Sequence, residues 1–267
     1  MLGHMRFGRI ATPEGMTFAV IDDEGKIAKA IAGTPFTDPE YTGKEYPLED
    51  VRLLAPTLPS KVVAVGRNYA DHVAEVFKQS SEHLPPTIFI KPSTAVVGPG
   101  AAIKIPEYAT GVEFEGELAL VVGVPCKNVK AADWKSVIRG VTIINDVSSR
   151  DLQFADGQWA RAKGIDTFGP IGPWIETDLE KFDFANLPIK AHHTHNGVTE
   201  TKQDSNSNQM IKSVGEMVEW VSESFTLLPG DVIATGSPAG TAEMVPGDYI
   251  EVEIPGIGKL GNPVERA

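Results

Sequence analysis

The pattern of hydrophobic positions along the chain predicts a protein built mainly from short β-strands. Some runs alternate apolar and polar residues, and others are continuously apolar, as in strands that are buried on both faces. Glycine and proline are scattered between these runs, where they favour turns. We expect two or three short strands within residues 5–31, and further strands at residues 61–66, 87–92, 112–123, 140–147, 231–236 and 248–264.

A helical period of three to four residues occurs in fewer places. Residues 69–79 and 131–140 each favour a helix, the second a short one. The clearest helix is predicted at residues 210–225, with apolar positions at Ile211, Val214, Met217, Val218 and Val221. The excess of strands over helices predicts an α+β fold that is mainly β, with a sheet-rich core.

A polar run that contains prolines, at residues 34–51, separates two parts of the chain. We interpret it as a boundary region, because such runs commonly connect domains. It predicts a small β-rich N-terminal domain at residues 1–58 and a larger domain at residues 59–267. Residues 1–4 resemble a cloning remnant that precedes a native start at Met5.

Composition and charge narrow the classes of function. The chain has 267 residues, 42% hydrophobic and 22% charged, as is ordinary for a globular protein. A formal net charge of −12 argues against a nucleic-acid partner, because phosphate contacts need clustered lysines and arginines. No apolar run approaches the roughly 20 residues that span a membrane, and no signal peptide is recognisable. Cys126 is the only cysteine, which excludes an intrachain disulfide and a cysteine-based zinc site. We therefore expect a cytosolic protein.

Three glutamates lie at alternate positions in the predicted strand at residues 112–123. Side chains of a strand alternate between its faces, so Glu113, Glu115 and Glu117 would share one face. Like charges placed side by side repel each other, and loss of solvent raises their pKa values. A solvated sheet face explains this pattern, and so does convergence of the acids on a cation. Both explanations remain open from this stretch alone.

Asp146 follows an apolar strand, where a charged residue has no packing role. With two of the glutamates it would provide three oxygen ligands. Ligation by oxygen alone suits Mg²⁺ or Mn²⁺ better than zinc. A turn-forming aspartate after a strand is an equally good explanation of Asp146 by itself.

His72 and Glu75 are three residues apart in a helical pattern and so share a helix face. A carboxylate beside an imidazole fixes the tautomer and raises the basicity of the imidazole, which prepares a general base. A surface His–Glu pair is the more frequent meaning of this spacing.

Two further stretches indicate a functional site only weakly. His193 and His195 would share a strand face and suit a metal, but Asn196-Gly197 favours the exposed end of a hairpin. Residues 235–241 contain glycines without the Gly-Lys-Ser/Thr of a phosphate loop, and a tight turn is expected there. Lys163, considered alone, is an ordinary surface lysine.

Several separate segments resemble, in the same order, those of the fumarylacetoacetate hydrolase family. The resemblance covers roughly residues 60–265. The segments are VGRNYADHVAE, IFIKPSTAVVGPG, EFEGELALVVG, INDVSSRDLQ, AKGIDTFGPIGPW and LLPGDVIATGSPAGT. The match implies a mixed β-sandwich roll or β-barrel, usually in a homodimer and often with a small N-terminal domain.

The resemblance also implies roles for individual residues. The family's metal ligands match Glu115, Glu117 and Asp146, which answers the question of the acidic strand as a hypothesis. The catalytic His–Glu pair matches His72 and Glu75, and the conserved lysine matches Lys163. Positions that line the substrate pocket match Arg67, Arg150, Gln153 and Thr235. The segment QDSNSNQM at residues 203–210 departs from the family pattern, which puts local substrate contacts in doubt.

The activity that we expect is metal-dependent cleavage of a carbon–carbon bond in a 2-oxo acid. The motifs are closest to members that act on small acylpyruvates and oxaloacetate, and we favour decarboxylation of oxaloacetate through an enolate that Mg²⁺ or Mn²⁺ stabilises. The alternatives are a hydrolase of acylpyruvates in which His72 and Glu75 activate water, and an isomerase or decarboxylase of longer unsaturated 2-oxo diacids. A metal-binding structural protein or an inactive relative would lack a ligand or the His–Glu pair, and the sequence has both.

Overall fold

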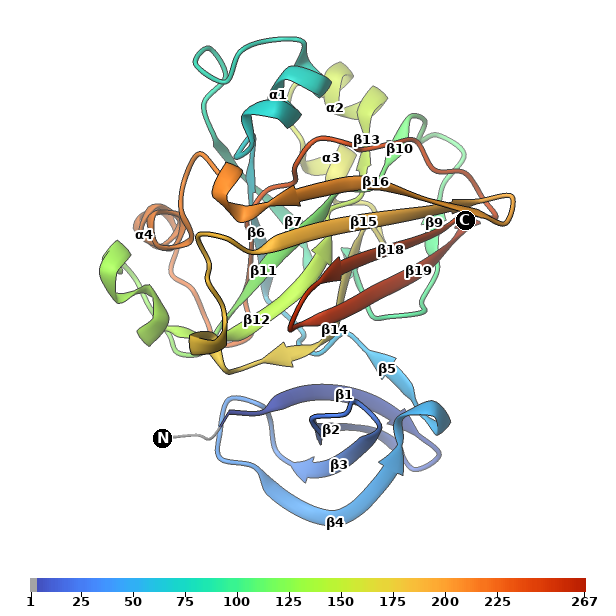
Figure 1. The fold of residues 1–267 in the computed structure, drawn as a ribbon, viewed down its shortest axis with the longest axis vertical. Coiled ribbons are helices and arrows are strands. Elements are labelled where there is room, and N and C mark those ends of the chain that lie inside the picture. Colours follow the sequence, from blue (N-terminus) through green and yellow to red (C-terminus); the bar gives the residue numbers. More distant parts are fainter. Residues whose placement is uncertain (1–3) are drawn as a thin grey trace.

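The computed structural model describes residues 4–267. The prediction of a cloning remnant at residues 1–4 falls almost wholly outside the described residues. Figure 1 shows the main body of the protein above a smaller group of strands, β1 to β5, with the C-terminus on the main body.

The largest sheet runs through both parts. Its strand order is β4-β3-β2-β1-β14-β12-β11-β17-β6-β7, and its neighbours are antiparallel except β17 and β6, which are parallel. The strands are β1 (Arg6–Thr12), β2 (Gly15–Ile21), β3 (Ile27–Ala32), β4 (Glu40–Pro47), β6 (Lys61–Gly66), β7 (Thr87–Pro92), β11 (Gly116–Val122), β12 (Ile138–Asn145), β14 (Gly169–Glu176) and β17 (Val232–Ala234). Two short strands pair beside it, β5 (Arg52–Leu54) with β1 and β8 (Val96–Val97) with β14.

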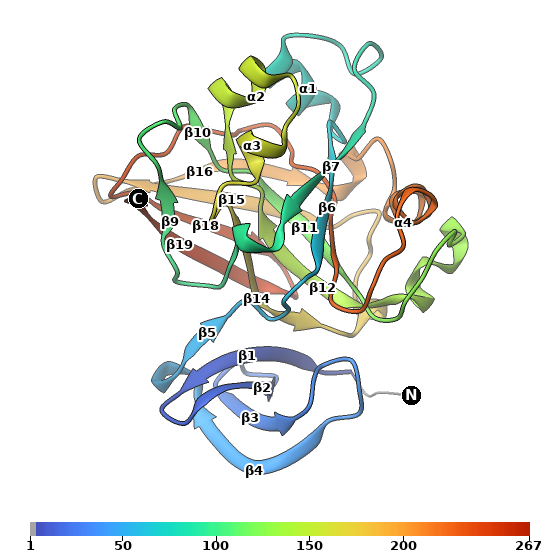
Figure 2. The ribbon, with the colours of Figure 1, turned by 180° about the vertical axis from the view of Figure 1, so that it is seen from behind.

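A second sheet packs across the first, as both views of the ribbon show (Figures 1 and 2). Its order is β16-β15-β18-β19-β9. These strands are β9 (Ile103–Ile105), β15 (Pro188–His195), β16 (Val198–Asn206), β18 (Tyr249–Ile254) and β19 (Gly258–Arg266), and β10 (Val112–Glu113) pairs separately with β13 (Ser148–Ser149).

Strand β11 shows how the core is divided. Leu118 and Leu120 belong to the core cluster that also contains Val252 of the second sheet. Ala119 and Val121 belong to another cluster, with Phe7 of β1. Because successive side chains of a strand alternate between faces, a strand that is covered on both sides must be apolar throughout.

The helices differ in part from their predictions. They are α1 (Ala70–Phe77), α2 (Arg150–Asp156), α3 (Ala160–Lys163) and α4 (Val214–Ser224). Helix α4 begins later than predicted because Ser213 and Glu216 form a capping box at its start. The helix expected at residues 131–140 is a 3₁₀-helix, η3 (Ala131–Ser136), and β12 begins soon after it. Helices α2 and α3 were not predicted.

The run at residues 34–51 is not simply a connection, because it contains β4. Side chains of β4 are mostly exposed, and the strand is held by its pairing with β3. The division at residues 58 and 59 stays a prediction, since β1 joins β14 of the main body through Arg6–Glu176 and Phe7–Ile175 pairing.

The prediction of a mainly β, α+β fold is confirmed. Within residues 4–267, the strands form packed open sheets and do not close into a barrel. No helix of this described part is long and apolar enough to cross a membrane.

Candidate active site

The acidic stretch at residues 112–123 is two strands and not one. β10 ends at Glu113, β11 begins at Gly116, and Phe114 and Glu115 lie between them. The expectation that three glutamates share one face is therefore wrong for Glu113. Its carboxylate accepts hydrogen bonds from Arg150 Nε at 2.8 Å and from Thr241 Oγ1 at 2.8 Å.

Glu115, Glu117 and Asp146 come together in the interior. Each offers a carboxylate oxygen within 4.8 Å of the others. All are buried, with 3%, 2% and 1% of their surface exposed. Strands β11 and β12 are paired, and the backbone N–H of Asp146 donates to the carbonyl of Glu115 at 2.8 Å. This bond holds Glu115 and Asp146 side by side. We call these residues the carboxylate cluster.

Two buried lysines face this cluster. Lys163 Nζ donates to Glu115 Oε2 at 2.8 Å and to Asp146 Oδ2 at 2.7 Å. Lys91 Nζ donates to Asp146 Oδ1, and this side chain is wholly buried. Lys91 was missed in the sequence, although a lysine within the apolar strand TIFIKP is a usable signal, because an unpaired buried ammonium is too costly to retain.

The charges of the cluster are unevenly balanced. Burial, together with the charges of Asp146 and Glu115, raises the pKa of Glu117 well above its ordinary value. Burial also favours protonated Glu115, but Lys163, Arg150 and His72 outweigh it and hold the pKa of Glu115 well below its ordinary value. Glu117 accepts a hydrogen bond from the backbone N–H of Gly236 at 2.7 Å.

This arrangement fits a divalent cation. Glu115 Oε1 accepts no aligned hydrogen bond, although the Arg150 guanidinium pairs with it at 2.7 Å. Burial and the neighbouring carboxylates raise the pKa of Glu117, so a positive ion beside it would favour its charged form. Three carboxylates suit Mg²⁺ or Mn²⁺.

His72 faces the cluster from α1. Its Nε2 lies 3.5 Å from Glu115 Oε1, and its Nδ1 lies 3.7 Å from Glu75 Oε2, which is too long for a hydrogen bond. Glu75 instead accepts from the backbone N–H of Gly240 at 3.0 Å. Although burial lowers the pKa of His72, its contacts with Glu115 and Glu75 raise it overall. The pair lies at the site, but not as a hydrogen-bonded dyad.

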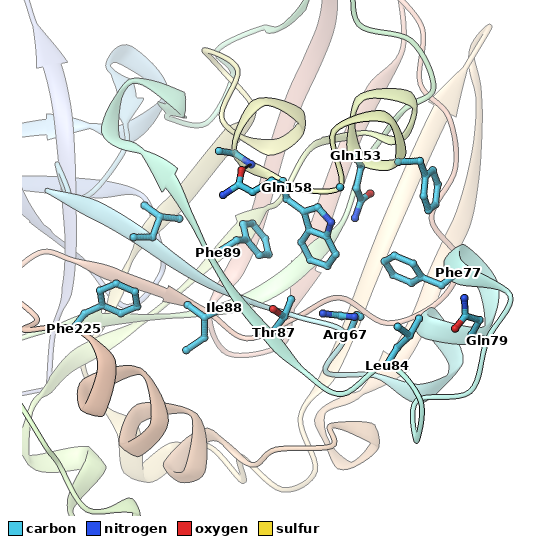
Figure 3. A pocket seen from close by; sticks show the side chains of 15 residues that line it. Arg67, Phe77, Gln79, Leu84, Thr87, Ile88, Phe89, Gln153, Gln158 and Phe225 are labelled. Atoms are coloured by element: carbon cyan, nitrogen blue, oxygen red, sulfur yellow. Dashed lines mark hydrogen bonds between the residues drawn. The ribbon is translucent and has the colours of Figure 1, made fainter.

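Arg150 and Gln153 connect the cluster to a cavity. Arg150 Nη1 donates to Gln153 Oε1 at 2.9 Å, and Gln153 lines the cavity. The cavity has a volume of about 820 Å³, and aromatic side chains alternate in its lining with aliphatic and amide side chains (Figure 3). Its wall includes Phe77 from α1, Phe89 from β7 and Trp159.

Arg67 is the one charged residue among the described residues that line this cavity. Its guanidinium carbon lies 5.4 Å from the ring centroid of Trp159 and 5.9 Å from that of Phe77. Lys163 Nζ lies 5.8 Å from the same Trp159 centroid and 4.8 Å from that of Phe89. The cavity wall and the carboxylate cluster therefore share Lys163 as a neighbour.

A model of the C-terminal domain of fumarylacetoacetate (FAA) hydrolase matches residues 61–265, and an Rv2993c-like N-terminal domain model matches residues 5–56. The chain belongs to the fumarylacetoacetate hydrolase family. Its fold superimposes on the crystal structure of Cg1458 with inhibitor at a TM-score of 0.98 and 73% identity, over 99% of this chain and 100% of that chain.

Other members of the fumarylacetoacetate hydrolase family have named activities. The mitochondrial oxaloacetate tautomerase Fahd2a of Rattus norvegicus is 39% identical over 227 residues, which are 82% of this chain and 71% of that protein. A maleylpyruvate hydrolase from Sphingobium sp. SYK-6, solved with manganese(II) and pyruvate, matches with a TM-score of 0.79 and 27% identity, over 98% and 100% of the chains. The family is one of enzymes, and at least one member binds a divalent metal.

Two positions behave differently from what the family resemblance alone suggests. Thr235 is fully buried, and its hydroxyl donates to the carbonyl of Leu118 at 2.9 Å, so a substrate contact for Thr235 rests on the resemblance alone. Gln203, from the segment that departs from the family pattern, accepts from the backbone N–H of Gly116 at 2.9 Å. This bond fixes the backbone between Glu115 and Glu117, and sequence reasoning missed it because the partners are distant in the chain.

The turn after β17 needs glycine at the site. Gly236 has a φ of +96°, and a Cβ there would lie 2.8 Å from Asn68 Cβ and 3.0 Å from the carbonyl of Val65. Both the backbone conformation and the space therefore exclude a side chain. The predicted tight turn at residues 235–241 thus brings a backbone N–H to a carboxylate of the cluster.

Proposed function

We propose that this protein is a divalent-metal-dependent enzyme that decarboxylates oxaloacetate, or a similar short β-keto acid, to pyruvate and CO₂. The observation that carries the proposal is the carboxylate cluster beside a cavity in which Arg67 is the single charged lining residue of the described chain. The 2-oxo acid end of such a substrate would lie at the carboxylate cluster, and its second carboxylate would pair with Arg67.

Glu115, Glu117 and Asp146 would hold Mg²⁺ or Mn²⁺. A bound ion supplies Lewis acidity that polarises the ketone of a 2-oxo acid. Lys91 pairs with Asp146 and Arg150 pairs with Glu115, so these two cations would hold carboxylates of the cluster in place.

Arg67 and Lys163 would bind and orient the substrate. Both cations lie near the indole of Trp159, 5.4 and 5.8 Å from its ring centroid, which supports a shared role in binding one diacid. Contact with the aromatic rings of the wall would remove part of the water from a bound substrate, which would strengthen the charge interactions there.

Loss of CO₂ needs no nucleophile. The C3–C4 bond breaks, its electron pair moves into the C2–C3 bond, and the ketone oxygen becomes the enolate oxygen. Lys163 Nζ would donate to that developing charge. A proton then adds to C3 and gives pyruvate, and His72 is the buried group on this side of the cluster that can deliver it.

Tautomerisation of oxaloacetate is a second candidate, because a relative at 39% identity is named an oxaloacetate tautomerase. That reaction removes and returns a proton at C3 and leaves the C3–C4 bond intact. It would depend more strongly on His72. Hydrolysis of an acylpyruvate would need water activated by His72 and Glu75, whose closest atoms are 3.7 Å apart.

The test is release of pyruvate and CO₂ from oxaloacetate by purified protein, with Mg²⁺ or Mn²⁺ and then with EDTA, after subtraction of spontaneous decay. The enol absorbance of oxaloacetate is followed in parallel, and acetylpyruvate is a second substrate. We expect metal-dependent pyruvate release that Glu117→Gln abolishes. Loss of enol absorbance without pyruvate would support the tautomerase, and turnover of acetylpyruvate alone would support the hydrolase.

We extend the proposal to a homodimer in the cytosol, as the family resemblance implies. Size-exclusion chromatography with light scattering checks the first point.

A further inference from the structure

A second group of potential metal ligands lies at the hairpin of the second sheet. His193 and His195 are on the same face of β15, and Asp248 precedes β18, which pairs with β15. His193 Nε2 lies 2.8 Å from Asp248 Oδ2, and His195 Nδ1 lies 2.6 Å from Asp248 Oδ1. One ligand atom from each residue lies within 4.8 Å of the others.

The group is partly enclosed and has an open side. The side chains of His193 and Asp248 are 8% and 2% exposed, whereas that of His195 is 53% exposed. A cavity of about 440 Å³ opens over them. Glu200 and Glu243 also line it, with Lys202 as the accompanying cation, so the cavity carries an excess of negative charge when the histidines are neutral.

We propose that His193, His195 and Asp248 form a second metal site, which takes a borderline transition metal such as Zn²⁺. Two imidazoles and a carboxylate are the donors of many zinc sites, and an open fourth position suits water. Each histidine nitrogen lies 2.6 or 2.8 Å from an oxygen of Asp248, and the three ligand atoms lie within 4.8 Å of one another. A tetrahedral ion with bonds of about 2.0–2.1 Å needs separations of about 3.3–3.4 Å between its ligand atoms.

The neighbouring residue shows why this group differs from an ordinary surface pair. His192, on the other face of β15, also lies near two acids, Glu251 and Glu253. Lys259 Nζ already pairs with both, at 2.7 Å from Glu251 and 3.3 Å from Glu253. Asp248 has histidines in place of a lysine, and a histidine can exchange its proton for a metal.

The proposed site differs chemically from the carboxylate cluster and touches the strand that carries it. The cluster offers oxygen alone, whereas this group offers two nitrogens and one oxygen. Hard ions such as Mg²⁺ would therefore prefer the cluster, and borderline ions such as Zn²⁺ would prefer this group. The ring of Phe114 packs edge-to-face on His193, with centroids 5.6 Å apart, and Phe114 directly precedes Glu115. An ion at this site would therefore brace the segment between β10 and β11.

The experiment uses untagged full-length protein, stripped with EDTA and then held in excess Mg²⁺ so that the carboxylate cluster is filled. Co²⁺ is titrated in as the probe, and its visible ligand-field bands report nitrogen ligation. We expect about one equivalent of band-forming Co²⁺ per chain, which Zn²⁺ displaces. Zn²⁺ should also raise the melting temperature of this Mg²⁺-saturated protein.

The variant His195→Ala should lose this equivalent, while oxaloacetate turnover with Mg²⁺ is unchanged. His195→Gln is a second variant that retains a polar side chain. His192→Ala is the matched control from the same strand, and it should retain the equivalent. Equal Co²⁺ bands in His195→Ala and wild type, or their complete loss in Asp146→Asn, would place the ion elsewhere and overturn the proposal. The bands do not depend on which reaction the enzyme catalyses.

Discussion

Two buried acidic sites in this protein have opposite balances of charge and hydrogen bonds. Asp231, just before β17, is fully buried and accepts from Ser60 Oγ at 2.6 Å and from the backbone N–H of Leu228 at 2.9 Å, and it pairs with Lys61. In the carboxylate cluster, Glu117 accepts from the backbone N–H of Gly236, and burial with the charges of Asp146 and Glu115 raises its pKa. A buried acid with all its partners stabilises the fold, whereas one whose charged form is disfavoured marks a place for a ligand.

The largest effect should come from removing a ligand of the cluster. Glu117→Gln should reduce metal affinity and turnover at least about 100-fold, which exceeds the usual cost of disturbing a ligand's surroundings. Without metal, the variant should be as stable as wild type or more stable, because a repulsive charge is gone. Isothermal titration and thermal melts in EDTA measure the two effects. A much lower melting temperature in EDTA would show that Glu117 is structural, like Asp231.

Lys163→Met should lower kcat by about 100-fold, since the side chain retains its length but loses the donor to the developing negative charge. The predicted signature is a fall in kcat that exceeds any rise in KM, measured on oxaloacetate with saturating Mg²⁺. Lys130→Met, at an exposed lysine, is the control for the substitution itself. An effect on KM alone would limit Lys163 to binding.

Arg67→Gln should raise KM for oxaloacetate about 10-fold, since one charge-assisted contact to the distal carboxylate is lost. Acetylpyruvate has no carboxylate at that end, so its inhibition constant should change little. Competition assays measure how much the substitution weakens the binding of each compound. Equal weakening of both would mean that Arg67 holds the aromatic wall and not the substrate.

Asp231→Asn should have the smallest effect on catalysis and a clear effect on stability, of about 2 kcal/mol at pH 7. Burial favours protonated Asp231, but hydrogen bonds from Lys61 and Ser60 lower its pKa below the ordinary value. The contribution of ionised Asp231 to the free energy of unfolding is therefore present above the unfolded pKa of about 3.9. It is lost as the pH falls through the lower pKa of the folded state.

Urea unfolding at pH 7 and at pH 3 checks this sign. The difference in the free energy of unfolding between wild type and Asp231→Asn should shrink at the lower pH. A constant difference would assign the effect to packing rather than to charge.

The sequence predicted what depends on local pattern. The strands at residues 61–66 and 87–92 have the predicted bounds, because continuous apolar runs between turns leave few alternatives. Strand β4 escaped prediction because its side chains are exposed and its backbone pairing alone holds it.

The sequence predicted which residues would be the ligands of the candidate site. It did not predict the cations and backbone contacts that surround them. Glu115, Glu117 and Asp146 were chosen together, and the structure brings them together. The break before Gly116 was not predictable, because Gln203 fixes it from β16 across the fold. The same limit applies to Lys91, since its partner Asp146 becomes its neighbour only through tertiary packing.

The place of β17 has a consequence for how the chain is made. β6 and β7 join the large sheet only through this short strand, since Val62 to Ala64 pair with Val232 to Ala234. Three residues of the candidate site belong to this edge: Arg67 directly follows β6, His72 lies in α1, and Lys91 lies in β7. During synthesis on the ribosome, this half of the site must wait for residues near the end of the chain before it can dock. The edge of β11 that pairs with β17 therefore stays open until β17 has emerged.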